Sequence, residues 1–121
     1  MQTIAAVTTG TEWLFDAHGC PPERLRDAAA LRGLLDSIVA RLALTVVGDP
    51  LWHTFGGEGG VTGLYLLSES HLTVHTYPEH GFAALNLYCC RPGLRPELSG
   101  LVAEALHAER VVVRELTRGD A

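Results

Sequence analysis

The chain has 121 residues, of which 47% are hydrophobic, so it is long enough for one folded domain and too short for two independent cores. Its formal net charge is -5, and its nine basic residues are arginines scattered between Arg24 and Arg118, which disfavours nucleic-acid binding. No apolar run reaches the roughly 18 residues of a membrane span, and no secretion-signal pattern opens the sequence, so we expect a cytoplasmic protein that contacts no membrane.

The first half of the chain predicts a strand, a helix and a second strand region. Residues 11–16 form a β-prone run, and Pro21-Pro22 then opens a helix, where the missing amide proton of proline costs nothing. One face of this helix is apolar and can cover a sheet, because four residues recur at helical spacing: Leu31, Leu35, Ile38 and Leu42. Residues 44–47 and 51–55 flank a Gly-Asp-Pro sequence, which predicts one kinked strand or two short strands joined by a turn.

The second half predicts an antiparallel meander followed by a helix and a last strand. Residues 56–60 contain four glycines, so this loop can approach a neighbour or a ligand closely, and the chain has no lysine to make it a phosphate loop. Strands are predicted at 61–67, 72–77, 82–88 and 111–116, with a helix between Pro92 and Ala108. The order β-α-β-β-β-β-α-β predicts an α+β fold: one domain over residues 1–121, built as a two-layer sandwich with two helices on one face of a mainly antiparallel sheet.

The densest cluster of polar side chains lies at residues 68–80. Strand alternation would place His71, Thr73, His75 and Tyr77 on one face and an apolar set on the other. A sheet face that is simply open to solvent would carry the same residues, so a site without function stays an alternative here.

A zinc site and a disulfide framework are both disfavoured. His71 and His75 could supply metal ligands together with Cys89 or Cys90, but two residues four apart on a strand are separated by roughly 13 Å, too far to share an ion. Three cysteines make an odd number, and the two adjacent ones are poorly placed to bridge each other. We therefore expect no metal and at least one free thiol.

The stretch from Ser68 to Ala84, SESHLTVHTYPEHGFAA, closely resembles the cleavage-site signature of the prokaryotic S-adenosylmethionine decarboxylase proenzymes. The resemblance extends from about Glu12 to Gly119 and includes the approach to the glycine loop at 53–55 and the Gly-Val-Thr-Gly sequence after it. A match of this length, with matching element order, is more specific than any isolated triplet. It implies a pyruvoyl-dependent decarboxylase that serves spermidine biosynthesis.

The resemblance implies that the protein makes its own cofactor. Ser70 would attack the carbonyl of Glu69 and form an ester, elimination would leave dehydroalanine, and hydrolysis would leave a pyruvoyl group. The chain would thereby be cut into residues 1–69 and 70–121. His75 matches a family histidine that assists this processing, and Thr62 matches a position that is usually serine.

The same resemblance assigns catalytic and substrate-binding residues. The pyruvoyl ketone would bind the substrate amine as a Schiff base and accept electrons as carbon dioxide leaves, and Cys90 matches the cysteine that returns a proton. Phe55 and Tyr77 match aromatic positions that hold adenine, and Glu79 matches a glutamate that binds the ribose hydroxyls. A homodimer of cleaved protomers with shared active sites is implied as well.

The chain departs from the family pattern at four places. Its glycine loop is one residue longer, Thr62 replaces serine, Asn86 stands where aspartate is common, and Cys89-Cys90-Arg91-Pro92 replaces threonine-cysteine-glycine-aspartate. Arg91 could bind a carboxylate or favour a thiolate beside it. These departures leave two alternatives: a pyruvoyl-dependent decarboxylase of another amino acid, such as arginine or ornithine, and a homologue that is not processed and has a binding or regulatory role.

Overall fold

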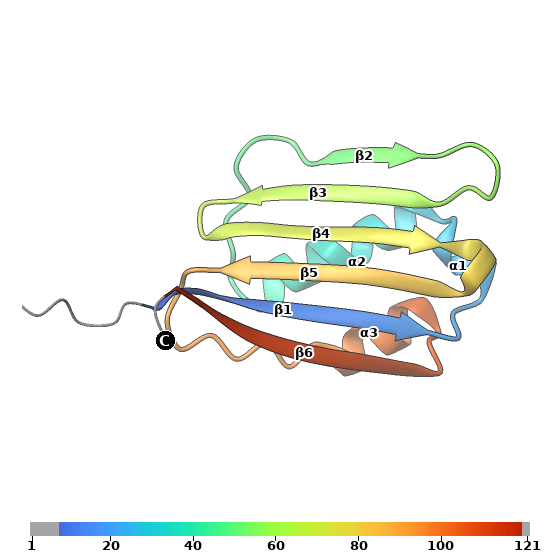
Figure 1. Ribbon diagram of the computed structural model, residues 1–121. Helices are drawn as coiled ribbons and strands as arrows, with labels where there is room; N and C mark the ends of the chain where they lie inside the picture. The colour runs from blue at the N-terminus through green and yellow to red at the C-terminus, as the bar shows by residue number, and fades with distance from the viewer. Residues whose placement is uncertain (1–7, 120–121) are drawn as a thin grey trace, which may run out of the picture.

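A computed structural model describes residues 8–119 as one six-stranded antiparallel sheet with all of its helices on one face (Figure 1). The strands are β1 (Thr8–His18), β2 (Leu51–Thr54), β3 (Val61–Leu67), β4 (Ser70–Tyr77), β5 (Phe82–Cys89) and β6 (Arg110–Gly119). The helices are α1 (Pro22–Leu25), α2 (Ala28–Arg41) and α3 (Ser99–Leu106), with a 3-10 turn η1 (Pro78–His80) before β5. This arrangement confirms the predicted α+β class; the ends of the predicted domain, 1–7 and 120–121, lie outside the described residues.

The strand order across the sheet is β2-β3-β4-β5-β1-β6. The first strand therefore lies inside the sheet, between β5 and β6, and the meander from β2 to β5 runs from the far edge of the sheet in to β1. All neighbouring strands pair antiparallel. No helix within residues 8–119 covers the other face of the sheet, which we call the open face (Figure 1).

The first predicted helix is two helices, because Asp27 interrupts it. The Asp27 backbone is extended, and its side chain accepts a hydrogen bond from the N–H of Ala30 at 3.0 Å, which caps α2. The apolar spacing predicted the buried face of α2 correctly, with Leu31, Leu35 and Ile38 buried against the sheet.

Two other predicted boundaries are wrong. Residues 44–47 are no strand and contribute only an isolated bridge between Val46 and Leu67. The second helix begins at Ser99, well after Pro92, because Pro96 cannot donate to a helix and disfavours helical geometry in the residue before it. Leu94 and Leu98 are buried as predicted for that segment, but Leu94 belongs to an irregular stretch.

The core lies between the sheet and the helices and fixes the orientation of β4. Leu72, Val74 and Thr76 point into it, so His71, His75 and the remaining alternate residues face the open side, as predicted. Thr76 is a polar member of this core, and its hydroxyl donates to the Leu25 carbonyl at 2.7 Å while accepting from the N–H of Val61 at 2.9 Å. Thr76 thereby connects α1 to β3 and β4.

Tyr65 makes a second polar connection through the core, from β3 to α2. Its hydroxyl donates to the carboxylate of Asp36 at 2.7 Å. Burial and the neighbouring Asp36 raise the pKa of Tyr65 above its ordinary range, so it stays a neutral donor. Within residues 8–119, none of the helices has the length and apolar character required to cross a bilayer.

Candidate active site

A cavity of about 410 Å³ opens where β3 begins and β4 ends, and it collects five of the residues predicted from the sequence. These five are Phe55, Thr62, His75, Tyr77 and Glu79. The side chains of Phe55 and Tyr77 are 53% and 43% exposed, so both rings are accessible from the cavity. An apolar hollow with a few polar groups is the usual form of a small-molecule site.

Thr62 and His75 are paired within this cavity by the register of the sheet. They lie directly opposite each other on β3 and β4, and the Thr62 hydroxyl is 3.0 Å from Nδ1 of His75. A hydroxyl in this contact orients the imidazole and can exchange a proton with it. The predicted partnership of these two residues therefore has a matching geometry.

The glycine loop forms one wall of the cavity. The N–H of Phe55 donates to the carbonyl of Gly60 at 2.8 Å, which closes the loop between β2 and β3. A Cβ atom on Gly60 would lie 2.7 Å from the carbonyl oxygen of Thr76, so only glycine allows this close approach. Arg26 holds the outer part of the loop, since its Nε donates to the Glu58 carbonyl at 2.8 Å.

The residues predicted to be cut lie at the opposite end of β4. Ser68 and Glu69 form the two-residue turn between β3 and β4, and Leu67 pairs with Ser70. Ser70 has a φ of 147°, a region that residues with side chains rarely adopt. The peptide bond between Glu69 and Ser70 therefore joins a turn to a strained residue.

The Glu69 carbonyl and carboxylate are both held by backbone N–H groups. The N–H of Cys90 donates to the carbonyl at 3.0 Å, and the N–H of Thr45 donates to the carboxylate at 3.2 Å. The Thr45 N–H, followed by the Ser68 side chain and more weakly by the charge of Arg91, lowers the pKa of the Glu69 carboxyl. The carbonyl that Ser70 is predicted to attack thus already accepts a hydrogen bond.

The two adjacent cysteines have different surroundings. Cys89 is buried in the core, as the packing interpretation predicted, whereas Cys90 is exposed directly after β5 and beside the turn at Ser68 and Glu69. Arg91 donates through its guanidinium to the carbonyls of Leu42 and Ala43, at 3.2 Å for Ala43. Arg91 is therefore bound to the C-terminal end of α2.

The two groups of predicted residues do not meet within one chain. Ser70 and His75 are five residues apart on the same extended strand, which separates them by roughly 16 Å at about 3.3 Å per residue. Glu69, Ser70 and Cys90 lie at one end of β4, and the cavity with Thr62 and His75 lies at the other. The structure thus brings the site residues together as two separate sets.

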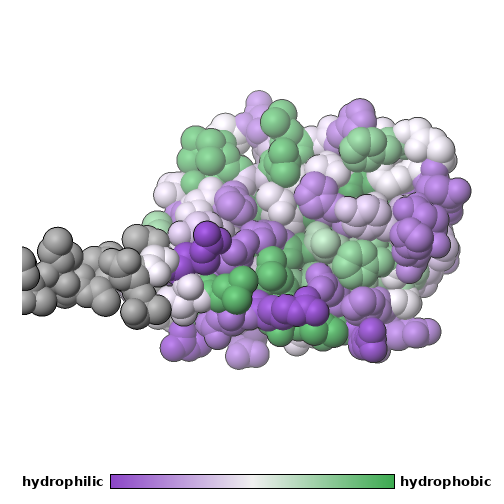
Figure 2. Space-filling model, in the orientation of Figure 1, coloured by the Kyte–Doolittle hydropathy of each residue, from purple (hydrophilic) through white to green (hydrophobic). Residues whose placement is uncertain are grey.

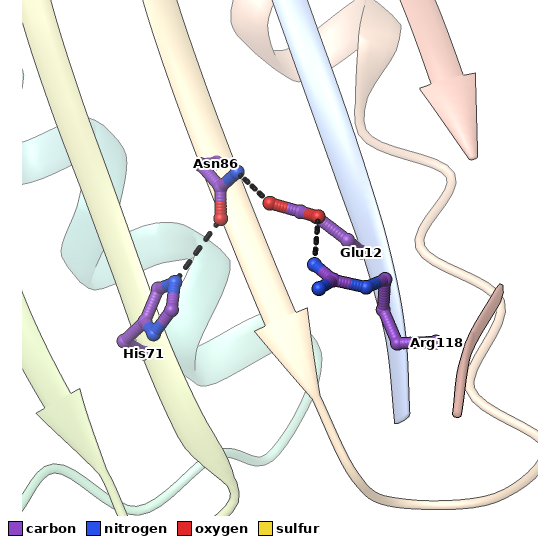
Figure 3. Close-up of polar contacts among 4 residues, drawn as sticks. All are labelled: Glu12, His71, Asn86 and Arg118. Atoms are coloured by element: carbon purple, nitrogen blue, oxygen red, sulfur yellow. Dashed lines mark hydrogen bonds and ion pairs between the residues drawn. The ribbon is translucent and has the colours of Figure 1, made fainter. Parts of the chain in front are cut away.

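A chain of polar side chains crosses four strands on the open face near Ser70 (Figure 3). Nε2 of His71 is 3.2 Å from Oδ1 of Asn86, Nδ2 of Asn86 donates to Glu12 at 2.6 Å, and Arg118 donates to the same carboxylate at 3.1 Å. Because the Glu12 carboxylate can only accept, Asn86 must turn its oxygen toward His71, whose Nε2 then carries the proton. Asn86 thereby fixes the orientation of the side chain that follows Ser70.

The open face also carries exposed apolar side chains over β2 and β3, which Figure 2 shows in green. Leu51 and Leu66 are 68% and 60% exposed, and with Leu64 and Val47 they line a hollow of about 550 Å³ that reaches His71. Single exposed apolar residues are ordinary, but a contiguous patch of them indicates a surface that another molecule covers.

Sequence reasoning missed the roles of Thr45 and Glu58. Thr45 acts through its backbone, so no side-chain pattern could identify it. Glu58 lines the cavity and is the one charged residue within the glycine loop, a signal that was available in the sequence. Among residues 8–119, no group of three histidine, cysteine or acidic side chains is arranged to hold a metal ion.

Comparisons with known proteins identify one family. The family described as S-adenosylmethionine decarboxylase matches residues 11–119 of the chain. An S-adenosylmethionine decarboxylase proenzyme from Symbiobacterium thermophilum is 38% identical over 96% of this chain and 87% of its own length. One from Thermodesulfovibrio yellowstonii is 32% identical over 91% of this chain and 81% of its own length.

A solved structure shares the whole architecture. The crystal structure of the adenosylmethionine decarboxylase from Aquifex aeolicus superposes with a TM-score of 0.80 at 28% sequence identity, covering 96% of this chain and 95% of that one. Sequence and overall structure therefore agree, and the chain belongs to the S-adenosylmethionine decarboxylase family.

Proposed function

We propose that this chain is a proenzyme that cuts itself between Glu69 and Ser70 and then decarboxylates S-adenosylmethionine, yielding the aminopropyl donor for spermidine synthesis. The observation that carries the proposal is the scissile turn, where a strained Ser70 follows a carbonyl that accepts the N–H of Cys90 at 3.0 Å. The relatives named as proenzymes support it, because that name implies a chain that must be processed.

The first chemical step needs a base and a hydrogen-bond donor to the carbonyl, and the donor is already in place. Ser70 Oγ gives up its proton to a base and bonds to the Glu69 carbonyl carbon, the C–N bond breaks, and the freed nitrogen takes a proton, leaving an ester. The negative charge that develops on the carbonyl oxygen is stabilised by the Cys90 N–H. Backbone strain at Ser70, on the order of 1–3 kcal/mol, is released as this peptide bond breaks.

The second step removes the ester. A base takes the Cα proton of Ser70 while the C–O bond breaks, so that Glu69 leaves as a carboxylate and residue 70 becomes dehydroalanine. Addition of one water and loss of one ammonia convert it to the pyruvoyl group. These steps would divide the chain into residues 1–69 and 70–121.

The residues around position 70 fit this group, because its precursor serine is partly exposed at the end of β4 and pairs with Cys89, next to the free thiol of Cys90. Once formed, the pyruvoyl group supplies an electron-withdrawing ketone for loss of carbon dioxide from an amino acid. The exposed Cys90 thiol is the group that returns a proton to the substrate after carbon dioxide has left. The Phe55 and Tyr77 rings bind adenine, and Glu79 accepts hydrogen bonds from the ribose.

We infer that a complete site requires two copies of the chain. The roughly 16 Å between Ser70 and His75 is too far for a proton transfer within one protomer. A two-fold homodimer that joins the open faces would place the Thr62–His75 cavity of one protomer at the Ser70 end of β4 in the other, twice. The exposed apolar patch formed by Val47, Leu51, Leu64 and Leu66 supports that face as the contact.

Intact-mass measurement of freshly purified protein tests the proposal. We expect two pieces, one ending at Glu69 and one beginning with a pyruvoyl-blocked residue 70, whereas the Ser70→Ala variant stays whole. Cyanoborohydride is then added in separate reactions with S-adenosylmethionine, arginine or ornithine. The amine that binds the pyruvoyl group is identified by the increase in mass of the fragment that begins at residue 70. A wild-type protein that is folded but uncut, and that traps no amine, would contradict the proposal.

A further inference from the structure

We propose that Arg91 is a positioning residue for self-cleavage, which holds the backbone N–H of Cys90 against the Glu69 carbonyl. The inference rests on the proposed function, because it concerns the rate at which the precursor is cut. It also assigns a role to a residue at which this chain departs from the glycine typical of its family.

The Arg91 side chain is anchored at the end of α2. Its guanidinium donates to the carbonyls of Leu42, the C-cap residue, and of Ala43. The last carbonyls of a helix have no partner within the helix and carry partial negative charge, so a cation that binds them is stabilised. This contact accounts for the arginine without a substrate carboxylate.

Residues 42–45, the linker that follows α2, also contact the turn at Ser68 and Glu69. Thr45 lies two residues beyond Ala43, and its N–H donates to the Glu69 carboxylate at 3.2 Å. Its carbonyl accepts the N–H of Ser68 at 2.9 Å. Residues 42–45 are therefore attached to Arg91 at one end and to the turn at the other.

These contacts close a ring around the bond to be cut. The ring runs from Glu69 to Thr45, along the linker to Ala43, through the Arg91 side chain to Cys90, and back to Glu69 by the 3.0 Å hydrogen bond. Apart from Glu69 itself, Arg91 is the residue whose side chain takes part, so a substitution can open the ring without altering the backbone.

The ring contains one strained residue and adjoins another. Ala43 has a φ of 53° and Ser70 a φ of 147°, and neither is glycine. Such backbone conformations persist only where the surrounding contacts hold them. Opening the ring therefore allows the turn to relax and the Cys90 N–H to move away from the carbonyl oxygen.

The expected cost is a slower cleavage with an intact fold. Complete loss of one N–H donor to a developing oxyanion slows other enzymes by about 10² to 10³. Arg91→Ala loosens this donor and does not remove it, so we expect cleavage to slow by about tenfold. Lysine can reach one of the two carbonyls as a single donor, so Arg91→Lys should recover part of the rate.

The test follows cleavage by intact mass during cell-free synthesis of four chains: the wild type, Arg91→Ala, Arg91→Lys and Arg95→Ala. Arg95 is the matched control, because it is in the same segment and its guanidinium donates to the adjacent Leu94 carbonyl. We expect Arg95→Ala to be cut at the wild-type rate. Once cleavage of Arg91→Ala is complete, its KM for S-adenosylmethionine should lie within about twofold of the wild-type value.

A second measurement does not depend on cleavage. In the uncuttable Ser70→Ala background, amide hydrogen exchange of Cys90 should be slow, and adding Arg91→Ala should accelerate it while amides in β1 keep their protection. Exchange at Cys90 that stays slow would overturn the inference even if the double variant is less stable overall.

The outcomes separate this inference from the proposed function. If the wild type is cut and Arg91→Ala is cut equally fast, the positioning role is wrong and the function stands. If Arg91→Ala is cut normally but its KM rises tenfold, Arg91 binds substrate instead. If the wild type is not cut at all, the proposed function fails, and the positioning role fails with it.

Discussion

Asn86 connects His71 and Glu12 across the open face. Its amide can do so because it has both a hydrogen-bond acceptor and a donor. It donates to Glu12 and accepts from His71. The hydrogen bond from Asn86, together with the Arg118 guanidinium, outweighs the partial burial of Glu12 and lowers the pKa of its carboxyl below the ordinary value of 4.5. An aspartate at 86 would instead place two carboxylates side by side.

The lowered pKa of Glu12 makes a prediction about acid stability. The folded protein binds the proton more weakly than the unfolded chain, so this contribution is fully present above about pH 4.5 and is lost as the pH falls through the lowered value. Urea unfolding at several pH values should show Glu12→Gln less stable than the wild type at pH 7, with the difference shrinking below pH 4.5. A difference that stays constant down to pH 3 would contradict the assignment.

Cys90 is expected to act in catalysis through its thiol and in cleavage through its backbone. Cys90→Ala keeps the N–H that contacts Glu69, so cleavage should continue, whereas release of carbon dioxide should fall by about 10² to 10⁴, the range for loss of a general acid. Cys89→Ala is the control, since its side chain is buried in the core and should affect stability more than turnover. Equal loss of turnover in both variants would show that the thiol of Cys90 has no special role.

At the scale of the elements, the hairpin formed by β2 and β3 depends on one close backbone contact. A methyl group on Gly60 would lie 2.7 Å from the Thr76 carbonyl oxygen. Because this oxygen belongs to the backbone and no side chain can move aside, the hairpin must shift. Gly60→Ala should lower the free energy of unfolding by about 1–3 kcal/mol, as overpacking does, and raise the KM by displacing Phe55.

Gly56 provides the matched control in the same loop. A Cβ atom there would meet nothing within 4 Å, so Gly56→Ala should leave the free energy of unfolding nearly unchanged. Urea unfolding of the two variants gives the comparison. Similar stability of both would show that the loop adapts to the added methyl group.

The elements themselves were largely predictable, and the errors have local causes. Alternation along β4 gave the correct buried face because one side of the strand packs on helices. The interruption at Asp27 was missed because one capping side chain outweighs continuous apolar spacing. Leu94 resembled a helical core residue because burial in an irregular segment leaves the same apolar spacing in the sequence.

The arrangement of the site was less accessible to sequence reasoning. The resemblance to a family predicted Ser70, Thr62 and His75 as site residues. Five of the predicted site residues line the same cavity in the structure. The hydrogen bond from Cys90 to Glu69 depends on strand register between distant segments, and no local pattern encodes it. The separation of His75 from Ser70 follows from the rise of a strand, which places two neighbours in sequence at opposite ends of an element.

At the scale of the whole molecule, a shared site predicts complementation between two inactive chains. His75→Ala alone should stay uncut, and so should Ser70→Ala. When the two are produced together, a mixed dimer joins Ser70 of the His75→Ala chain to the partner's His75, so the His75→Ala chain should be cut. Intact mass distinguishes the two chains, and an uncut His75→Ala chain in verified mixed dimers would show that the histidine acts within its own protomer.

The strand order has a consequence for what self-cutting does to the molecule. Residues 8–69 contribute β1, β2 and β3, and residues 70–119 contribute β4, β5 and β6, yet in the sheet β1 is inserted between β5 and β6. Strands of the two products therefore alternate in the sheet. Separating the products would break three strand pairings: β3 with β4, β5 with β1, and β1 with β6. The proposed cut would thus free the new end of the chain for chemistry, while these ladders would keep the two fragments together in one folded unit.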